Sequence, residues 1–246
     1  MTDRRLCLPL QIIPGLVAGT TRHIFVRMNP QPMFLTGRGK RIYDDKDYRR
    51  SWEDDPYADI GFEPEDRVWI GEPHALVPAS AYRRSAGVMQ RVDPGSTDRA
   101  AIYRSGWERS NPGVWRSGAI MSRWASRLTF EIEAVKVQHL QDISEEQALG
   151  SGIATVLTQE AIDANPALPG KRSEDFGWKN YLWCGLPGRR RGTLPTQSAR
   201  AQDAVQSFAS LWEWIHGKGA WEANPYVAAL QVTPHLINID DMEPRT

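Results

Sequence analysis

One long segment of alternating residues limits the folds open to this chain. From Leu128 to Glu133, apolar and polar residues alternate strictly, which predicts a strand with one buried face. Beyond Glu133 the pattern changes parity, because Val135 and Val137 continue it on the other set of positions. A β-bulge near residues 133–134 would bring the apolar side chains back to one face, and bulges accompany strong bending. The chain is therefore expected to contain a long, bent strand.

The other expected elements are short. Ser144 and Gln147 fit a helix capping box, with Ile143 and Ala148 spaced as a hydrophobic staple. Apolar residues at intervals of three and four predict an amphipathic helix over 201–216. The remaining expected elements are strands at Arg22–Met28, Val68–Ile70, Ala100–Tyr103 and Tyr226–Thr233, and a turn of helix between Pro14 and Gly19. Because regular strand–helix alternation is missing, this order predicts an α+β fold: a small bent β-barrel with flanking helices.

Long loops are expected between these elements. The 17 prolines favour shaped connections, and three segments show little periodicity. We expect one domain over residues 1–246, with insertions at about 36–60, 76–100 and 163–200. The last of these contains Arg189–Arg191, which is either a phosphate-binding arm or a solvated loop tip.

Composition narrows the cellular setting and the partners. The chain has 246 residues, with 30 basic and 30 acidic side chains, so nucleic-acid binding would depend on a local patch. No apolar run approaches a membrane span, and the N-terminal apolar stretch is too short for a signal peptide. Only two cysteines are present, which favours a reducing compartment. A cytoplasmic protein without a membrane partner is expected.

Several kinds of site are not predicted. The five histidines are scattered, and no His or Cys pair has the spacing of metal ligands, so neither a metal nor a cofactor is expected. There is no Gly-x-Ser-x-Gly motif. The stretch Gly37–Lys40 lacks the spacing of a phosphate-binding P-loop.

The loop before the long strand is the strongest candidate site. It interleaves arginine, tryptophan and serine, and the residues of interest are Arg123, Trp124, Ser126 and Arg127. Guanidinium groups bind phosphates and an indole stacks on a base, so this composition favours a nucleic-acid or nucleotide pocket. The alternative interpretation is that Trp124 belongs to the core and that the arginines pair with carboxylates or carbonyls. Glu72, after the expected strand at Val68–Ile70, is a candidate acid or base.

Four segments resemble, in the same order, the motifs of one family. They are Pro14–Pro32, Glu65–Glu72 (Glu-Asp-Arg-Val-Trp-Ile-Gly-Glu), Met121–Arg127 with Leu140–Glu146, and Phe208–Pro225 with its His-Gly-Lys-Gly-Ala-Trp-Glu-Ala-Asn-Pro ending. Together they are similar to a phage- and prophage-type branch of the ASCH-domain proteins, which belong to the PUA-like superfamily. The resemblance covers somewhat under half of the chain. It implies a PUA-like barrel with a cleft proposed to bind RNA or modified nucleosides.

The resemblance also implies a catalytic set that this chain does not fully keep. Some small family members are amidohydrolases on N4-acylated cytidines, and ribonuclease activity is associated with the family. Their chemistry resembles a Lys/Thr/Glu set, of which Glu72 is retained here. After Gly19 the Lys and Thr positions hold Thr21 and Ile24, or Arg22 and Phe25 with a one-residue shift. An arginine is a poor base but a good phosphate ligand.

Three hypotheses follow. The first is an ASCH-type protein that binds RNA or a nucleotide-like ligand in a cleft lined by Glu72 and the Arg123–Arg127 loop, with Arg22 or His23 at the rim. The second is a nucleic-acid or nucleoside hydrolase that uses Glu72, either a ribonuclease or an N4-acylcytidine amidohydrolase. The third is a non-catalytic phage protein that contacts partners through residues 36–60 and 163–200.

Overall fold

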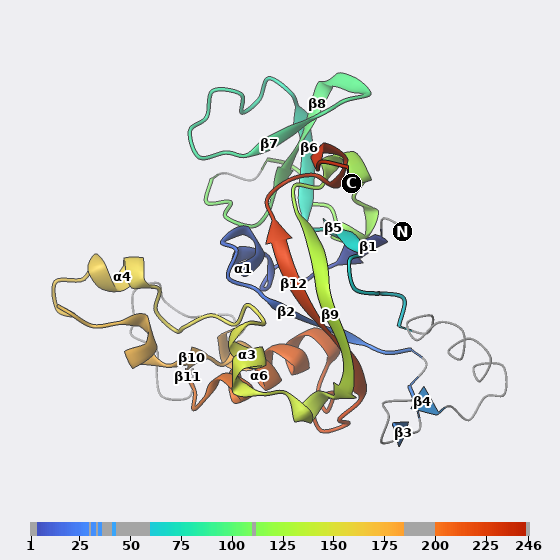
Figure 1. Ribbon diagram of the computed structural model, residues 1–246. Coiled ribbons are helices and arrows are strands. Elements are labelled where there is room, and N and C mark those ends of the chain that lie inside the picture. The colour runs from blue at the N-terminus through green and yellow to red at the C-terminus, as the bar shows by residue number, and fades with distance from the viewer. Residues whose placement is uncertain are drawn as a thin grey trace. The chain divides into compact units, whose positions relative to one another are not determined.

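The chain forms two compact units. The computed structural model describes residues 4–29, 31–32, 34–35, 41–42, 60–109, 112–184 and 200–244 (Figure 1). Unit 1 comprises residues 1–24, 51–135 and 230–246, and unit 2 comprises residues 25–50 and 136–229. Three strands, β2, β9 and β12, contain a boundary between these ranges, and the expected single domain stays a prediction.

The largest sheet has five strands in the order β1-β5-β9-β12-β2. Their bounds are Arg4–Cys7 (β1), Arg67–Gly71 (β5), Thr129–His139 (β9), Tyr226–His235 (β12) and His23–Arg27 (β2). Strand β1 runs parallel to β5, and β5 pairs with β9 in antiparallel fashion. Because β1 and β2 are the outer strands, the sheet is open. The expected α+β class is confirmed, but the described strands do not close into the expected barrel.

Strand β9 is the long strand that the alternating pattern predicts. Phe130 and Ile132 are buried, and the next two residues, Glu133 and Ala134, are both exposed. Val135 then begins a half-buried set on the opposite parity. The change of parity near residues 133–134 is therefore present in the burial of the strand.

A second sheet in unit 1 replaces an expected loop. Its strands are His74–Pro78 (β6), Gln90–Asp93 (β7) and Ser96–Tyr103 (β8), in the antiparallel order β6-β8-β7 (Figure 1). The sequence predicts only a brief strand at Ala100–Tyr103, at the end of the insertion expected over 76–100. The buried positions include Ala75, Ala100 and Ala101, whose small side chains give a weak apolar signal. Pairing between neighbouring strands stabilises this sheet instead.

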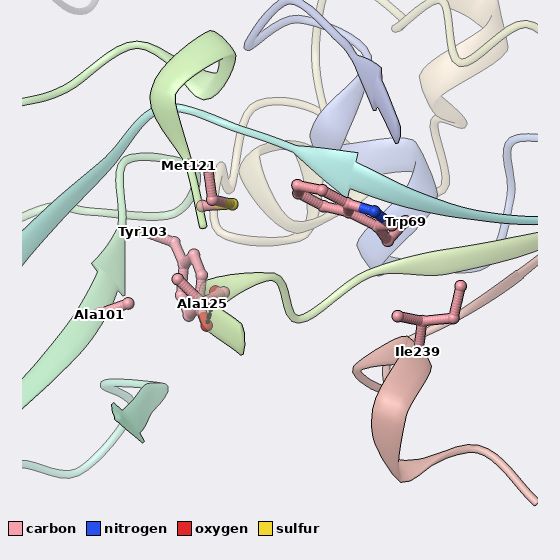
Figure 2. Packing of buried hydrophobic residues seen from close by; sticks show 6 residues of the cluster. All are labelled: Trp69, Ala101, Tyr103, Met121, Ala125 and Ile239. Atoms are coloured by element: carbon pink, nitrogen blue, oxygen red, sulfur yellow. Dashed lines mark hydrogen bonds between the residues drawn. The ribbon is translucent and has the colours of Figure 1, made fainter. Parts of the chain in front are cut away.

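The core of unit 1 joins this sheet to the end of β5. Figure 2 shows the buried cluster, whose members are Trp69, Ala101, Tyr103, Met121, Ala125 and Ile239. The Tyr103 hydroxyl donates to the Ala125 carbonyl at 2.9 Å, so its polar end is satisfied inside the core. Three single turns of 3₁₀-helix border the cluster: η1 (Gly118–Ile120), η2 (Arg123–Ala125) and η6 (Ile239–Asp241).

Gly71 and Gly118 lie back to back where β5 ends and η1 begins. A Cβ atom added to either glycine would collide with the backbone of the other. This close approach fixes the loop before η2 against the end of β5. The helix α1 (Ile13–Val17), with Pro14 in its first turn, also belongs to unit 1.

Unit 2 contains the two predicted helices. Helix α3 (Glu145–Leu149) has the expected capping box between Ser144 and Gln147, and the staple residues on either side of its start are buried. Helix α6 (Ala204–His216) begins after the N-cap Asp203 and ends at Gly217, within the predicted range. No helix among the described residues is long and apolar enough to cross a membrane.

The remaining elements of unit 2 are short. They are β3 (Phe34–Leu35), β4 (Arg41–Ile42), η3 (Leu140–Asp142), α4 (Gln159–Asp163), η4 (Ser173–Phe176), β10 (Trp178–Lys179), α5 (Tyr181–Cys184) and β11 (Arg200–Ala201). The expected insertion at 163–200 thus holds short elements up to residue 184. The other part of it, with Arg189–Arg191, and most of the expected insertion at 36–60 lie outside the described residues.

Candidate functional site

Unit 1 contains a cavity of about 430 Å³, which is within the size range of small-ligand sites. Its lining comes from helix α1, the loop before β7, the end of β8 with the following loop, and the residue two before β9. The lining residues are Pro14, Val17, Ala18, Gly87, Val88, Met89, Tyr103, Ser105, Gly106, Trp107 and Arg127. Apolar and aromatic groups thus surround one cation, Arg127.

A buried carboxylate fixes the position of Arg127. Its Nε donates to Glu72 Oε1 at 2.8 Å, and its Nη2 donates to Glu72 Oε2 at 3.0 Å. This is the two-pronged geometry that arginine forms with a carboxylate. The side chain of Glu72 is 0% exposed and that of Arg127 is 10% exposed. The pair therefore lies almost entirely out of water, with the arginine at the cavity wall.

The strand register explains why these two residues meet. Glu72 directly follows β5, and Arg127 lies two residues before β9, with Trp69 opposite Thr129 in the antiparallel pairing. Continuing this register brings the end of β5 beside the residues that precede β9. The amide of Ile70 bonds to the Leu128 carbonyl at 2.9 Å and extends the pairing in that direction.

The guanidinium of Arg127 also lies over an aromatic ring. Its Cζ is 4.1 Å from the ring centroid of Tyr103, within the range of a cation–π contact. Burial raises the pKa of the Tyr103 hydroxyl, which therefore stays neutral. Tyr103 and Arg127 thus form a rigid stacked pair at the wall of the cavity.

Opposing effects act on the pKa of Glu72. Burial raises it above its usual value, whereas the hydrogen bond and the positive charge of Arg127 lower it, and burial is the larger effect. Next to it, burial lowers the pKa of His74, whose Nδ1 lies 3.2 Å from the Glu72 carbonyl oxygen. When Glu72 is ionised, its charge balances that of Arg127, so the pair contributes no net charge to the cavity.

The other residues of the predicted loop do not line the cavity. Arg123 pairs with Asp240 at 2.7 Å, and the Ser126 hydroxyl has two backbone acceptors for its one proton, the carbonyls of Ile70 at 2.9 Å and Leu128 at 3.0 Å. Trp124 packs against the core cluster. For these three residues the structure matches the alternative interpretation, a core tryptophan with a paired arginine and a structural serine. Only Arg127 of this loop reaches the cavity.

Arg22 and His23 are not at this cavity either. Both lie near Glu133 of β9, whose pKa is lowered chiefly by hydrogen bonds from Thr233 and then Gln231, and further by the charges of Arg22 and His23. Arg22 is exposed and His23 is half-buried. The expected rim position for these two residues is therefore not seen in the part of the chain that the structure describes.

Three residues of the cavity were missed from the sequence. Met89 comes from the segment over 76–100 that was expected to be an insertion, whereas Tyr103 and Trp107 follow that segment. One signal was present, since Tyr103 ends the brief strand that was predicted at Ala100–Tyr103. Trp107 also contacts Tyr82 and Trp115 edge to face, with ring centroids 5.1 and 5.7 Å away.

Neither a metal site nor a known relative defines the site further. Within the described residues, no group of three His, Cys, Asp or Glu side chains could hold a metal ion. Comparison of the chain with protein-family models, with curated proteins and with solved structures finds no match. The ASCH resemblance therefore rests on the four sequence motifs alone.

Proposed function

We propose that unit 1 binds a nucleobase, as part of RNA or of a nucleotide-like ligand, in the cavity at Arg127. One observation carries the proposal. A cavity of ligand size has, at its wall, a guanidinium that is stacked on Tyr103 and fixed by Glu72. Planar bases stack on aromatic side chains and on arginine, and apolar pockets with a few fixed polar groups bind small ligands.

The hydrogen bonds of Arg127 indicate how a base would be held. Glu72 occupies Nε and Nη2, whereas among the described residues the partner of Nη1 is the sulfur of Met89, at 3.7 Å. Met89 and Arg127 both line the cavity. An oxygen or ring nitrogen on the edge of a base can accept a hydrogen bond from Nη1. Since Glu72 prevents rotation of the guanidinium, this donor is in place before the ligand arrives.

The geometry favours binding over hydrolysis. A general acid or base must reach the reacting group, and Glu72 is 0% exposed with both carboxylate oxygens bonded to Arg127. Glu72 is not among the residues that line the cavity. We therefore assign Glu72 a positioning role, and a hydrolase that uses it directly is the second candidate. Turnover of RNA or of acylated cytidines that is lost in Glu72→Gln would favour that candidate.

The four sequence motifs support the same proposal. They resemble ASCH-domain proteins of the PUA-like superfamily, and the second and third motifs contain Glu72 and Arg127. We propose that the chain is a distant, phage- or prophage-type relative that acts in the cytoplasm. It keeps the ligand cleft of the family and has lost the Lys and Thr positions of its amidohydrolases.

Binding of short single-stranded RNA and of free nucleotides to a paired variant tests the proposal. Glu72→Leu combined with Arg127→Met removes the cation from the cavity without leaving a buried charge alone. Because stacking on one base contributes about 1–3 kcal/mol, we expect the affinity to fall about tenfold or more.

The matched control is Arg67→Met with Glu131→Leu. It removes a second ion pair of unit 1, with Nε and Oε1 2.9 Å apart and side chains 19% and 30% exposed. We expect this control to bind as the wild type does. The proposal fails if the folded wild type binds neither RNA nor nucleotides at low salt, or if the two paired variants bind equally well.

A further inference from the structure

The cavity lies within a segment that is rich in arginine. Residues 79–127 contain nine arginines, no lysine and three acidic residues, a net charge of +6 in a chain whose net charge is zero. Four of these arginines form ion pairs: Arg91 with Asp241, Arg99 with Asp93, Arg123 with Asp240 and Arg127 with Glu72. The other five have no ion pair among the described residues, and all are exposed: Arg83, Arg84, Arg104, Arg109 and Arg116.

Three of these exposed arginines lie on the two loops that contribute lining residues to the cavity, and we call them the rim. Arg104 lies between Tyr103 and Ser105, which both line the cavity. Arg109 donates from Nη2 to the carbonyl of Ala86, the residue before the lining residues Gly87–Met89. Arg84 belongs to the same short loop. The rim therefore consists of Arg84, Arg104 and Arg109, on the two loops that line the cavity.

Aromatic side chains accompany the rim. The guanidinium of Arg104 lies 5.3 Å from the ring centroid of Trp115, which in turn contacts Trp107 edge to face. Trp107 lines the cavity, and both tryptophans are half-buried. Exposed cations beside partly exposed aromatic rings are the combination that binds single-stranded nucleic acids, with phosphates on the cations and bases on the rings.

The neutral cavity and the charged rim suit different parts of a ligand. The Arg127–Glu72 pair is neutral and almost buried, so it offers a phosphate little net attraction. The rim arginines are exposed and form no ion pair among the described residues. The cavity is therefore suited to the uncharged base, and the rim is suited to phosphates outside it.

We propose that the rim binds the phosphates on either side of the nucleotide whose base occupies the cavity. The ligand is then a single-stranded polynucleotide and not a free nucleotide. This inference rests on the proposed base-binding cavity. The rim residues lie outside all four motifs that carry the family resemblance, so their role is not transferred from it.

The test compares ligands of different length. Binding of a nucleoside and of single-stranded RNA and DNA oligonucleotides of two to eight nucleotides is measured by titration at 50 and 200 mM salt. We expect affinity to rise with length, and that of the longer oligonucleotides to fall about tenfold or more between the two salt concentrations. Three phosphate contacts correspond to a slope of about −2 in log affinity against log salt.

Two triple variants show whether the rim arginines cause the dependence of affinity on length and salt. Arg84→Gln/Arg104→Gln/Arg109→Gln is expected to lose most of the length-dependent gain and most of the salt dependence, while its affinity for the nucleoside, which has no phosphate, stays unchanged. The control, Arg5→Gln/Arg22→Gln/Lys136→Gln, removes the same charge from exposed positions outside the rim and is expected to behave as the wild type.

The outcomes separate this inference from the proposed function. Oligonucleotides that bind no tighter than the nucleoside, or an equal loss in the two triple variants, would contradict phosphate binding at the rim but not base binding in the cavity. An affinity for oligonucleotides that is unchanged in Glu72→Leu/Arg127→Met would contradict base binding in the cavity. The RNA and DNA series show whether the 2′-hydroxyl contributes, and a duplex of the same sequence is expected to compete poorly, because its bases are paired.

Discussion

Replacing Arg127 with alanine should be far more costly to the fold than an ordinary surface substitution. The change leaves the carboxylate of Glu72 at 0% exposure without the two hydrogen bonds, of 2.8 and 3.0 Å, that now balance its charge. Removing one partner of such a buried pair costs about 3–5 kcal/mol. For a chain of this size, each kcal/mol lowers the unfolding temperature by about 2–4 °C. We therefore expect a decrease on the order of 10 °C for Arg127→Ala.

Replacing Glu72 alone, or Glu72 and Arg127 together, should destabilise the fold less than Arg127→Ala does. In Glu72→Gln, Arg127 keeps a neutral acceptor and lies at the wall of a cavity where water can reach it, so a cost of about 1–3 kcal/mol is expected. In Glu72→Leu/Arg127→Met no charge is left buried, and stability should stay within about 2 kcal/mol of the wild type. Urea unfolding at pH 7 measures the free energy of unfolding of all three variants. An Arg127→Ala cost below about 1 kcal/mol, or a cost of Glu72→Leu/Arg127→Met as large as the sum of the two single costs, would refute the role assigned to the pair.

Three further predictions concern other residues of the two units. Gly118→Ala should lower the free energy of unfolding by more than about 2 kcal/mol, because its Cβ would collide with the backbone of Gly71. An unchanged free energy of unfolding would contradict that close approach. Ser144→Ala removes the side-chain acceptor for the Gln147 amide and should cost about 1 kcal/mol in urea unfolding. Burial holds the pKa of His74 below its ordinary value, so the neutral form is favoured in the folded state. Stability present above about pH 6.5 should therefore be lost as the pH falls, and by less in His74→Leu.

The elements with strong local signals were predictable. The alternation over Leu128–Glu133 sets the phase of β9, and the spacing of Ser144 and Gln147 fixes the start of α3. The apolar stripe and Gly217 together mark the course and end of α6. Each of these signals acts within a few residues of sequence, so it does not depend on distant parts of the chain.

The three-stranded sheet of unit 1 was missed for the opposite reason. Its buried positions include alanines, and its stability depends on pairing between β6 and β8, which are some 20 residues apart in sequence. Met89 and Trp107 therefore lie in segments without a recognisable sequence pattern. The barrel was expected from the bend of β9 and from the family resemblance, yet closure depends on contacts between edge strands that local patterns do not encode.

The candidate site was predicted only in part. The loop before β9 and Glu72 were both singled out, and their meeting through Arg127 is present in the structure. Arg123 and Ser126 have the same composition signal as Arg127, but one pairs with Asp240 and the other bonds to backbone. Sequence shows which side chains can bind a ligand, whereas the fold decides which of them are already engaged.

The most direct test of base binding follows the side chains of the cavity during a titration. In ¹H–¹⁵N NMR spectra, the Nε–H group of Arg127 and the indole N–H of Trp107 report on the cavity, and the exposed indole of Trp214 in unit 2 serves as the control. With a short single-stranded RNA, we predict saturable shifts of the Arg127 and Trp107 signals, an unshifted Trp214 signal, and no such shifts in Glu72→Leu/Arg127→Met. Unchanged Arg127 and Trp107 signals at saturating RNA would contradict the account.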